Sequence, residues 1–365
     1  MNYLYFLYIE YLSKYNISKL FGDITFFIIP FCIIATLLII VVLAIVLVER
    51  KLLGWFTQRK GPNRVGFWGI LQTIADAFKL LTKENITPQK ADRFLFNLAP
   101  ILVFIPVMTV MGIIPYSSEF TFVNTSTNVI LYLILVAFPI LSIFLAGWAS
   151  SNKYSLIGAM RGIAQVLSYE LPITFVVLSI IVLSSSMNLT GIALAQYSAY
   201  GIMGWFIIPG LLGFIIMFIS ILAELNRCPF DLPEAESELI CGYNTEYSGM
   251  RFAMFYLSEY ALLFVNALFL SILFFGGYLS PFGVYISHIF WGDSSIASIL
   301  VYFEQAFWLI LKAFIIIFFV IWIRATLPRL ASFDLLKFSW VILLPLSILN
   351  LFIIVLYRWY MGGCI

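Results

Sequence analysis

Carboxylates are concentrated in one short polar segment of the chain. Within 16 residues it carries Asp231, Glu234, Glu236, Glu238 and Glu246. Apolar residues such as Phe230, Leu232 and Leu239 interrupt and flank the run. Carboxylates crowded in surroundings of low dielectric cannot all ionise, so they share protons and titrate as a coupled set. The segment is therefore a candidate proton relay, with an ordinary solvated charged loop as the alternative.

Three further acids, Glu170, Glu224 and Glu259, lie inside or at the rims of long apolar stretches. A charged side chain there costs a few kcal/mol or more unless it is paired or protonated, so these positions are functional candidates. The alternative is a purely structural ion pair at the rim. Glu224 and Arg227, three residues apart, could pair in this way.

Arginines supply counter-charges for these acids. An arginine stays protonated and can hold a carboxylate in its ionised form or bind a polar head group. The candidates are Arg50, Arg59, Arg161, Arg227, Arg251, Arg324 and Arg329. For any single arginine, the usual excess of basic residues on one side of a membrane is an equally good explanation.

The cysteines and the histidine form no recognisable framework for a redox centre. Cys32, Cys228, Cys241 and Cys364 contain no CxxC pair, and the single histidine, His288, cannot supply both imidazoles of a bis-histidine haem. We therefore predict no metal site, no redox centre and no catalytic residue within this chain. His288 is expected at a membrane interface.

Membrane helices must position these residues. Of 365 residues, 63% are hydrophobic and 10% are charged, with a mean hydropathy of +1.05, whereas soluble domains carry about 25% charged residues. A soluble core cannot hide that much apolar surface. We predict an all-α integral membrane protein in which residues 1–365 form a single transmembrane domain.

Eight apolar stretches have the length of about 20 residues that is needed to cross a bilayer. They cover approximately residues 24–48, 95–115, 129–149, 169–187, 204–226, 253–279, 306–323 and 340–357. Sixteen of the 20 lysines and arginines fall in the odd-numbered loops, at 49–94, 150–168, 227–252 and 324–339. By the positive-inside rule these loops share the cytoplasmic or matrix side.

The first of these loops contains a periodic apolar pattern between Gly66 and Lys83. Its apolar positions are Phe67, Ile70, Leu71, Ile74, Phe78 and Leu81. Polar residues, including Asp76, fall on another face, so the pattern predicts an amphipathic helix that lies in the membrane interface. This helix could be a simple anchor or one wall of a pocket that opens to lipid.

Several long segments resemble the NADH dehydrogenase subunit 1 family of respiratory complex I. The similarity is carried by VERKLLGWFTQRKGPNRVGFWGILQTIADAFKLLTKE (48–84), GWASSNKYSLIGAMRGIAQVLSYE (147–170), AELNRCPFDLPEAESELICGYNTEYSGMRF (223–252), SEY (258–260) and WIRATLPRLASFDLL (322–336). The resemblance implies a core membrane-arm subunit of proton-pumping NADH:ubiquinone oxidoreductase. Such a subunit forms the ubiquinone access channel, part of the chamber wall and an acidic proton-coupling path.

The resemblance also implies site residues, position by position. Those lining the quinone channel match Arg50, Arg59, Asp76, Ala77, Phe252, Phe255, Arg324 and Arg329. The family positions that couple the quinone chamber to proton movement match Glu49, Glu84, Arg161, Glu170, Glu224, Arg227, Asp231, Glu234, Glu236, Glu238, Glu246 and Glu259. The last loop departs from the family: Asp334 matches, but RLASFDLLK lacks the usual neighbouring arginine and tyrosine.

The implied cofactors lie outside the chain. Ubiquinone would bind as substrate at an interface with peripheral-arm subunits, one of which carries the terminal iron–sulfur cluster. NAD, FMN and the iron–sulfur clusters would belong to partner subunits, and small membrane-arm subunits, antiporter-like subunits and lipids would surround the chain, without nucleic acid. The 36 phenylalanines and 20 tyrosines fit an organellar gene. They favour the mitochondrial inner membrane, with the bacterial plasma membrane as the alternative.

Two other functions use the same residue types. A membrane subunit of an energy-converting hydrogenase would share the fold but serve a hydrogen-evolving partner. A stand-alone proton or ion transporter would use the same intramembrane acids, although the absence of an inverted repeat counts against it. Residues 1–23 are expected to form an N-terminal extension and not a cleaved leader.

Overall fold

A computed structural model describes residues 19–198, 201–233, 236–285, 287 and 295–360. The described part is helical and contains no strand. Its longer helices are α2 (Lys19–Phe56), α4 (Arg93–Ile113), α7 (Lys153–Ser184), α11 (Gly249–Phe274), α13 (Ser295–Thr326) and α15 (Leu344–Tyr360). The shorter α-helices are α3 (Gln72–Thr82), α5 (Asn128–Ala137), α6 (Pro139–Ala149), α8 (Leu189–Ala195), α9 (Leu211–Glu224), α10 (Glu236–Leu239) and α14 (Ser332–Lys337).

Seven helical stretches in the described residues are long and apolar enough to cross a membrane. They are Phe31–Phe56, Arg93–Ile113, Asn128–Ala149, Lys153–Ser184, Gly249–Phe274, Leu300–Thr326 and Ser332–Tyr360. Each coincides with one of the predicted spans, which confirms an all-α multi-pass membrane protein. Asn128–Ala149 joins α5 and α6 at Pro139, which lacks the N–H needed to continue the helical ladder.

The predicted fifth span, 204–226, is corrected to the 14-residue helix α9. Turns precede Leu211, where Pro209 and Gly210 lie, and the backbone N–H of Ile207 donates to the carbonyl of Phe274 at 3.1 Å. The approach to α9 is thus bonded to the end of α11 and is not helical itself.

Two helices extend beyond their predicted ends. α2 continues to Phe56, and α7 begins at Lys153 after a short turn, so most of the predicted loop 150–168 is helical. Glu49, Arg50 and Arg161, which were expected in loops, therefore lie on helices. Helical backbone fixes their directions more firmly than loop backbone would.

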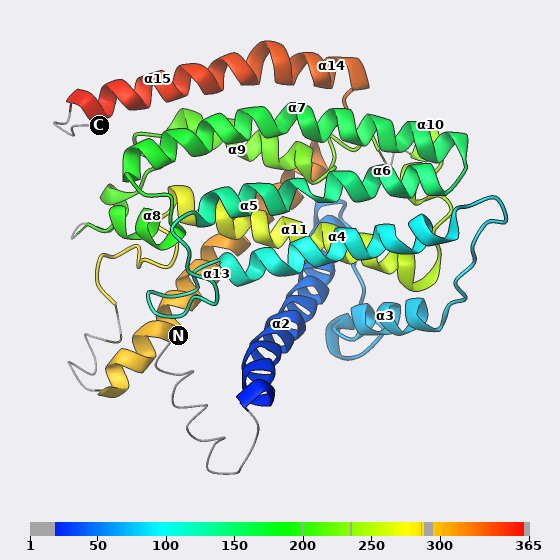
Figure 1. The fold of residues 1–365 in the computed structure, drawn as a ribbon, viewed down its shortest axis with the longest axis horizontal. Helices are drawn as coiled ribbons and strands as arrows, with labels where there is room; N and C mark the ends of the chain where they lie inside the picture. The colour runs from blue at the N-terminus through cyan, green and yellow to red at the C-terminus, as the bar shows by residue number, and fades with distance from the viewer. Residues whose placement is uncertain (1–18, 199–200, 234–235, 286, 288–294, 361–365) are drawn as a thin grey trace.

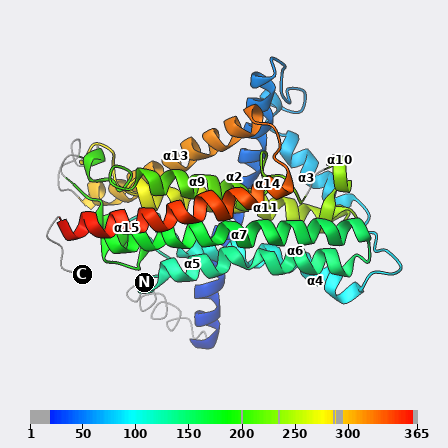
Figure 2. The ribbon, with the colours of Figure 1, turned by 90° about the horizontal axis from the view of Figure 1, so that it is seen from above.

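Helix α11 forms the centre of the bundle. It packs against α2, α3, α4 and α13, and its apolar side chains are almost all buried. Helices α4, α5 with α6, α7 and α15 run in a similar direction, whereas α2 crosses them steeply (Figures 1 and 2). Both views place α3, α10 and α14 at the same end of the molecule, which is also where the predicted basic loops gather.

Helix α3 confirms the predicted amphipathic helix, with a shorter extent. Positive φ angles at Gly66, Trp68 and Gly69 keep the preceding residues in a 3₁₀ turn. The apolar side chains Ile74, Phe78 and Leu81 are exposed, whereas Thr73 is buried. The apolar face thus points away from the rest of the chain, as it would toward lipid, and the polar face points inward.

A buried lysine holds the irregular backbone that follows α11. Nζ of Lys312, on α13, donates to the carbonyls of Phe275, Gly277 and Leu279 at 2.8, 2.8 and 2.6 Å. It also lies 4.6 Å from the centre of the Trp205 ring. Unbonded carbonyls at membrane depth would be costly, and the lysine supplies three donors to satisfy them.

We expect Lys312→Met to destabilise the protein. The change leaves these carbonyls without their donor, and a buried unsatisfied polar group costs about 1–3 kcal/mol. The midpoint of thermal unfolding of the detergent-solubilised protein should fall, whereas Lys337→Met, at an exposed lysine, should leave it unchanged. Equal midpoints for both variants would contradict this role of Lys312.

Candidate functional site

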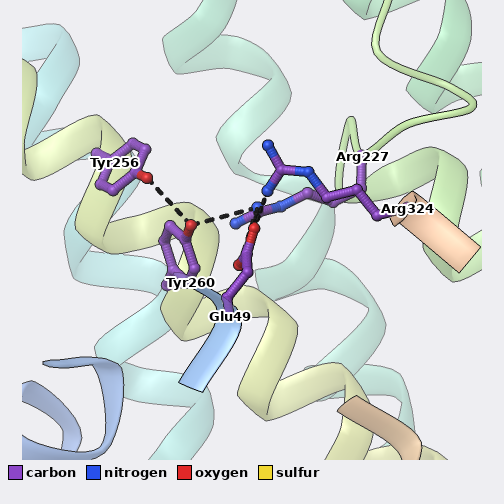
Figure 3. Close-up of polar contacts among 5 residues, drawn as sticks. All are labelled: Glu49, Arg227, Tyr256, Tyr260 and Arg324. Atoms are coloured by element: carbon purple, nitrogen blue, oxygen red, sulfur yellow. Dashed lines mark hydrogen bonds and ion pairs between the residues drawn. The ribbon is translucent and has the colours of Figure 1, made fainter. Parts of the chain in front are cut away.

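A buried carboxylate is shared by two arginines at the end of the molecule where α3 lies. Glu49, on α2, is 3% exposed. It accepts hydrogen bonds from Nη1 of Arg227 at 3.1 and 3.3 Å, and Nη1 of Arg324, on α13, bonds the same carboxylate (Figure 3). One carboxylate therefore bonds two guanidinium groups, and the negative charge of Glu259 also acts on Arg227.

Two tyrosines of α11 complete this group, here called the Glu49 cluster: Glu49, Arg227, Tyr256, Tyr260 and Arg324 (Figure 3). The Arg227 guanidinium lies 4.2 Å from the centre of the Tyr260 ring and donates to its hydroxyl at 3.4 Å. The two hydroxyls are 3.0 Å apart. Burial alone would lower the pKa of Arg227, but Glu49 and Tyr260 raise it above its ordinary value.

Arg227 retains unused donors. Its Nε and Nη2 atoms are buried and have no hydrogen-bond partner among the described residues. A guanidinium with free donors can bind an anionic or polar head group. The Glu49 cluster is therefore suited to binding a polar or transiently charged ligand.

A second ion pair joins α2 to the amphipathic helix. Arg50 follows Glu49 on α2 and pairs with Asp76 of α3, which also accepts a hydrogen bond from Gln72 at 3.1 Å. Ala77, next to Asp76, is half-buried. The pair holds the polar face of α3 against α2 and leaves its apolar face outward.

The two predicted phenylalanines of α11 lie in different surroundings. Phe252 is partly buried and stacks with Tyr256 of the Glu49 cluster, with ring centres 6.2 Å apart. Phe255 is fully buried, with edge contacts to Tyr243 and Tyr247. Phe252 is thus near the arginines, whereas Phe255 lines a cavity among the acids.

Two small cavities have Glu224 in their linings. One, of about 40 Å³ and here called the Glu259 cavity, is lined by Glu224, Tyr243, Phe255 and Glu259 among other residues. The other, of about 80 Å³ and here called the Glu170 cavity, is lined by Glu170, Glu224 and Asn266 among others. The three acids predicted inside apolar spans therefore border two cavities, and Glu224 lines both of them.

Each of these acids has a distinct environment. Glu259 accepts a hydrogen bond from the Tyr243 hydroxyl at 2.9 Å, and Glu224 accepts one from Asn266 at 3.2 Å. The Oε1 atom of Glu170 is buried without a hydrogen-bond partner among the described residues. Alternating acids and small cavities with room for water can pass protons stepwise.

The acidic loop between α9 and α11 is held in place by ion pairs and a hydrogen bond to neighbouring residues. Arg161 pairs with Glu238 at 2.5 Å, Arg329 pairs with Asp231 at 2.9 Å, and Asn152 donates to Glu246 at 2.7 Å. The predicted arginines thus do meet the acids, although through partly exposed contacts of small energetic value.

Some predicted site residues are not brought into this arrangement. The side chains of Arg59 and Glu84 are exposed, away from the cavities and the Glu49 cluster. Glu234, the side chain of Glu236 and His288 lie outside the described residues.

Several polar residues of the site were not singled out from the sequence. They are Tyr132, Tyr243, Tyr256, Tyr260 and Asn266. A usable signal existed for one of them, because Asn266 follows Glu259 by seven residues and so lies on the same face of α11. The others required the tertiary contacts, since a tyrosine in an apolar span resembles any other aromatic core residue.

Comparison with known proteins adds a second line of evidence. The family model described as NADH dehydrogenase matches residues 29–355. A protein of Brevibacillus brevis, named as a subunit of NADH-quinone oxidoreductase, is 44% identical over 337 residues, which are 91% of this chain and 94% of that protein. Proteins with the same name from Bacillus cytotoxicus and Geobacillus sp. are each 42% identical, over 89% and 84% of this chain and 93% and 86% of their own lengths.

We expect Glu49→Gln to be strongly destabilising. Removing one partner of a buried ion pair leaves uncompensated charge and costs about 3–5 kcal/mol, and here two arginines lose their shared carboxylate. Loss of the protein from membranes, or a large fall in its thermal midpoint, measures the effect. Glu238→Gln is the matched control, because the side chain of Glu238 is 56% exposed in its pair with Arg161, and its removal should cost about 1 kcal/mol or less. Equal stability of both variants would show that the negative charge of Glu49 is not needed to stabilise Arg227 and Arg324.

Proposed function

The chain belongs to the NADH dehydrogenase subunit 1 family, and from this premise we propose that it forms the quinone entrance and an acidic proton path of an NADH-quinone oxidoreductase. The observation that carries the proposal is the position of Arg227. Its guanidinium bonds Glu49, while its backbone follows Glu224 by three residues. Arg227 thus belongs both to the Glu49 cluster and to the segment that follows the intramembrane acid Glu224.

The quinone entrance is assigned to the space bordered by α2, α3 and α11. Ubiquinone has an apolar tail and a polar head, so its path must lead from lipid to polar side chains. The exposed apolar face of α3 borders the lipid, and Arg50, Asp76 and Ala77 lie on or beside its inward face. The Glu49 cluster, with Phe252 beside it, supplies the polar end, and Arg59, Phe255 and Arg329 remain channel candidates by family resemblance.

The proton path is assigned to the acids that lie beyond Arg227. Glu259, Glu224 and Glu170 border two cavities in sequence, and Asp231, Glu238 and Glu246 lie in the loop that connects α9 to α11. Reduction of a quinone consumes two protons and changes the local charge. We propose that this change shifts shared protons among the acids and biases the conformation of the loop.

The redox centres of such an enzyme are assigned to other subunits. NAD, FMN and the iron–sulfur clusters would be held by the peripheral arm, and small membrane-arm and antiporter-like subunits would continue the proton path. The names of the relatives favour this function over that of a hydrogenase component or a stand-alone transporter. Those relatives are bacterial, so we propose the bacterial plasma membrane in place of the mitochondrial inner membrane.

We expect Ala77→Phe to raise the apparent quinone KM several-fold, because the larger ring would occupy the inward side of α3. The measurement is NADH:quinone turnover of the assembled complex at varied quinone concentration. Leu81→Phe is the matched control, since Leu81 lies on the same helix with its side chain exposed. An unchanged KM in the Ala77 variant would make α3 an anchor only.

We expect Glu224→Gln to lower NADH:quinone turnover about tenfold or more while NADH oxidation by an artificial hydrophilic acceptor continues, because the variant removes the acid shared by both cavities. The two rates are measured on the same membranes, together with proton uptake. Glu119→Gln, at an exposed acid, should behave as the unmodified protein does. Full quinone turnover with normal pumping in the Glu224 variant would overturn the assignment of the path.

A further inference from the structure

A tyrosine hydroxyl in the membrane interior has a single polar partner among the described residues. Tyr132 lies on α5, is 2% exposed and donates its hydroxyl hydrogen to Oδ1 of Asn266 at 2.5 Å. Its ring stacks on Phe269 with the ring centres 3.6 Å apart. Both the ring and the hydroxyl are thus held in one position.

The hydrogen donated by the Tyr132 hydroxyl favours one orientation of the Asn266 amide. An asparagine can present either its oxygen, an acceptor, or its nitrogen, a donor. Because Tyr132 occupies the oxygen, Nδ2 is the end that reaches Glu224, and it donates to Oε2 at 3.2 Å. Asn266 is 1% exposed, so solvent cannot compete for either end.

The two carboxyl oxygens of Glu224 are therefore not equivalent. Oε2 receives the amide hydrogen and cannot itself carry a proton toward Asn266. Oε1 accepts no hydrogen bond from a described residue, and Glu224 lines both cavities. The hydrogen bond to Oε2 therefore favours Oε1 as the atom on which a proton taken up by Glu224 resides.

We propose that Tyr132 and Asn266 are positioning residues that fix Oε2 of Glu224 as an acceptor and thereby confine proton exchange to Oε1. The inference rests on the proposed function of Glu224 in the proton path and deepens it. The step involves only a proton, which moves between Oε1 and water in a cavity and returns by the same route or passes to the next acid.

The titratable groups around Glu224 come from four elements. Glu170 of α7 and Tyr132 of α5 line the Glu170 cavity, and Glu259 of α11 and Tyr243, from the turn before α11, line the Glu259 cavity. Helix α15 also packs on α9 but contributes no residue to either cavity lining. Among these groups only Tyr132 acts on Glu224 through Asn266.

The test is a double-mutant cycle in the intact complex. Tyr132→Phe removes the hydroxyl alone and frees the Asn266 amide to turn, so that the acid form of Glu224 can donate to its oxygen. We expect the pH dependence of NADH:quinone turnover to shift along the pH axis. On one side of the pH optimum, turnover should change by about threefold to tenfold, which is the effect of one hydrogen bond. Asn266→Leu should move the profile as well, and the double variant should match Asn266→Leu, because Tyr132 acts through Asn266.

An infrared measurement gives an independent readout. The C=O stretching band of protonated Glu224, identified by its loss in Glu224→Gln, should shift in Tyr132→Phe because the carboxyl gains a different hydrogen-bond partner. Tyr116→Phe is the matched control, since Tyr116 also donates a partly buried hydroxyl, to the carbonyl of Met111 at 3.2 Å and away from both cavities. It should change neither the band nor the pH profile.

The outcomes separate this inference from the proposed function. A pH profile and an infrared band of Tyr132→Phe that superimpose on those of the unmodified complex overturn the inference, as do additive effects in the cycle. If the complex with Asn266→Leu fails to assemble, the infrared band of the Tyr132→Phe variant alone decides whether the inference holds. If Glu224→Gln itself leaves turnover and proton uptake unchanged, the proposed proton path fails, whatever Tyr132 does.

Discussion

The shared ion pair at Glu49 is the interaction on which this end of the molecule depends. A single carboxylate on α2 bonds Arg227 from the segment after α9 and Arg324 from the end of α13. The charges of Glu49 and Arg227 would be costly to bury alone, so their pairing stabilises the contact between these segments. The side chain of Arg324 is 36% exposed, and Glu259 also acts on Arg227, so Glu49 is not the only group that balances the two arginines. The buried donors of Arg227 that have no partner among the described residues distinguish the group from a purely structural salt bridge.

Arg227 connects the two proposed activities. Arg227 contributes to the Glu49 cluster through its side chain and starts the acidic loop through its backbone, while Tyr260 bonds it from α11, the helix that also carries Glu259 and Asn266. A change of charge near Glu49 would therefore act on Arg227 and Tyr260. These two residues lie close in the chain to the acids Glu224 and Glu259. Charges interact strongly over such short distances where water is largely excluded, which supports the proposed coupling.

Membrane burial imposes a second constraint, which is met by polar side chains elsewhere in the fold. The non-helical backbone before α9 and after α11 has N–H and C=O groups without helical partners. Gln196 accepts from the N–H groups of Phe206 and Gly276 at 3.2 and 2.9 Å and donates to the carbonyl of Ile272 at 2.8 Å. Lys312 satisfies the carbonyls that follow. These residues hold the end of α11 in place, and α11 in turn positions the acids and tyrosines of the site.

The sequence by itself determined the membrane class, seven of the spans, the amphipathic helix and the types of charged residue in the site. Hydrophobic length, helical periodicity and charge placement are local properties, so they can be read without knowing the fold. It did not determine that α2 and α7 carry Glu49 and Arg161 on helices, or that the fifth apolar stretch yields only a short helix, because backbone bonds to α11 decide the latter. Pairings such as Glu49 with Arg324 or Tyr132 with Asn266 join residues 275 and 134 positions apart. Only the tertiary structure could select them, since many arginines and tyrosines were available and packing geometry chose among them.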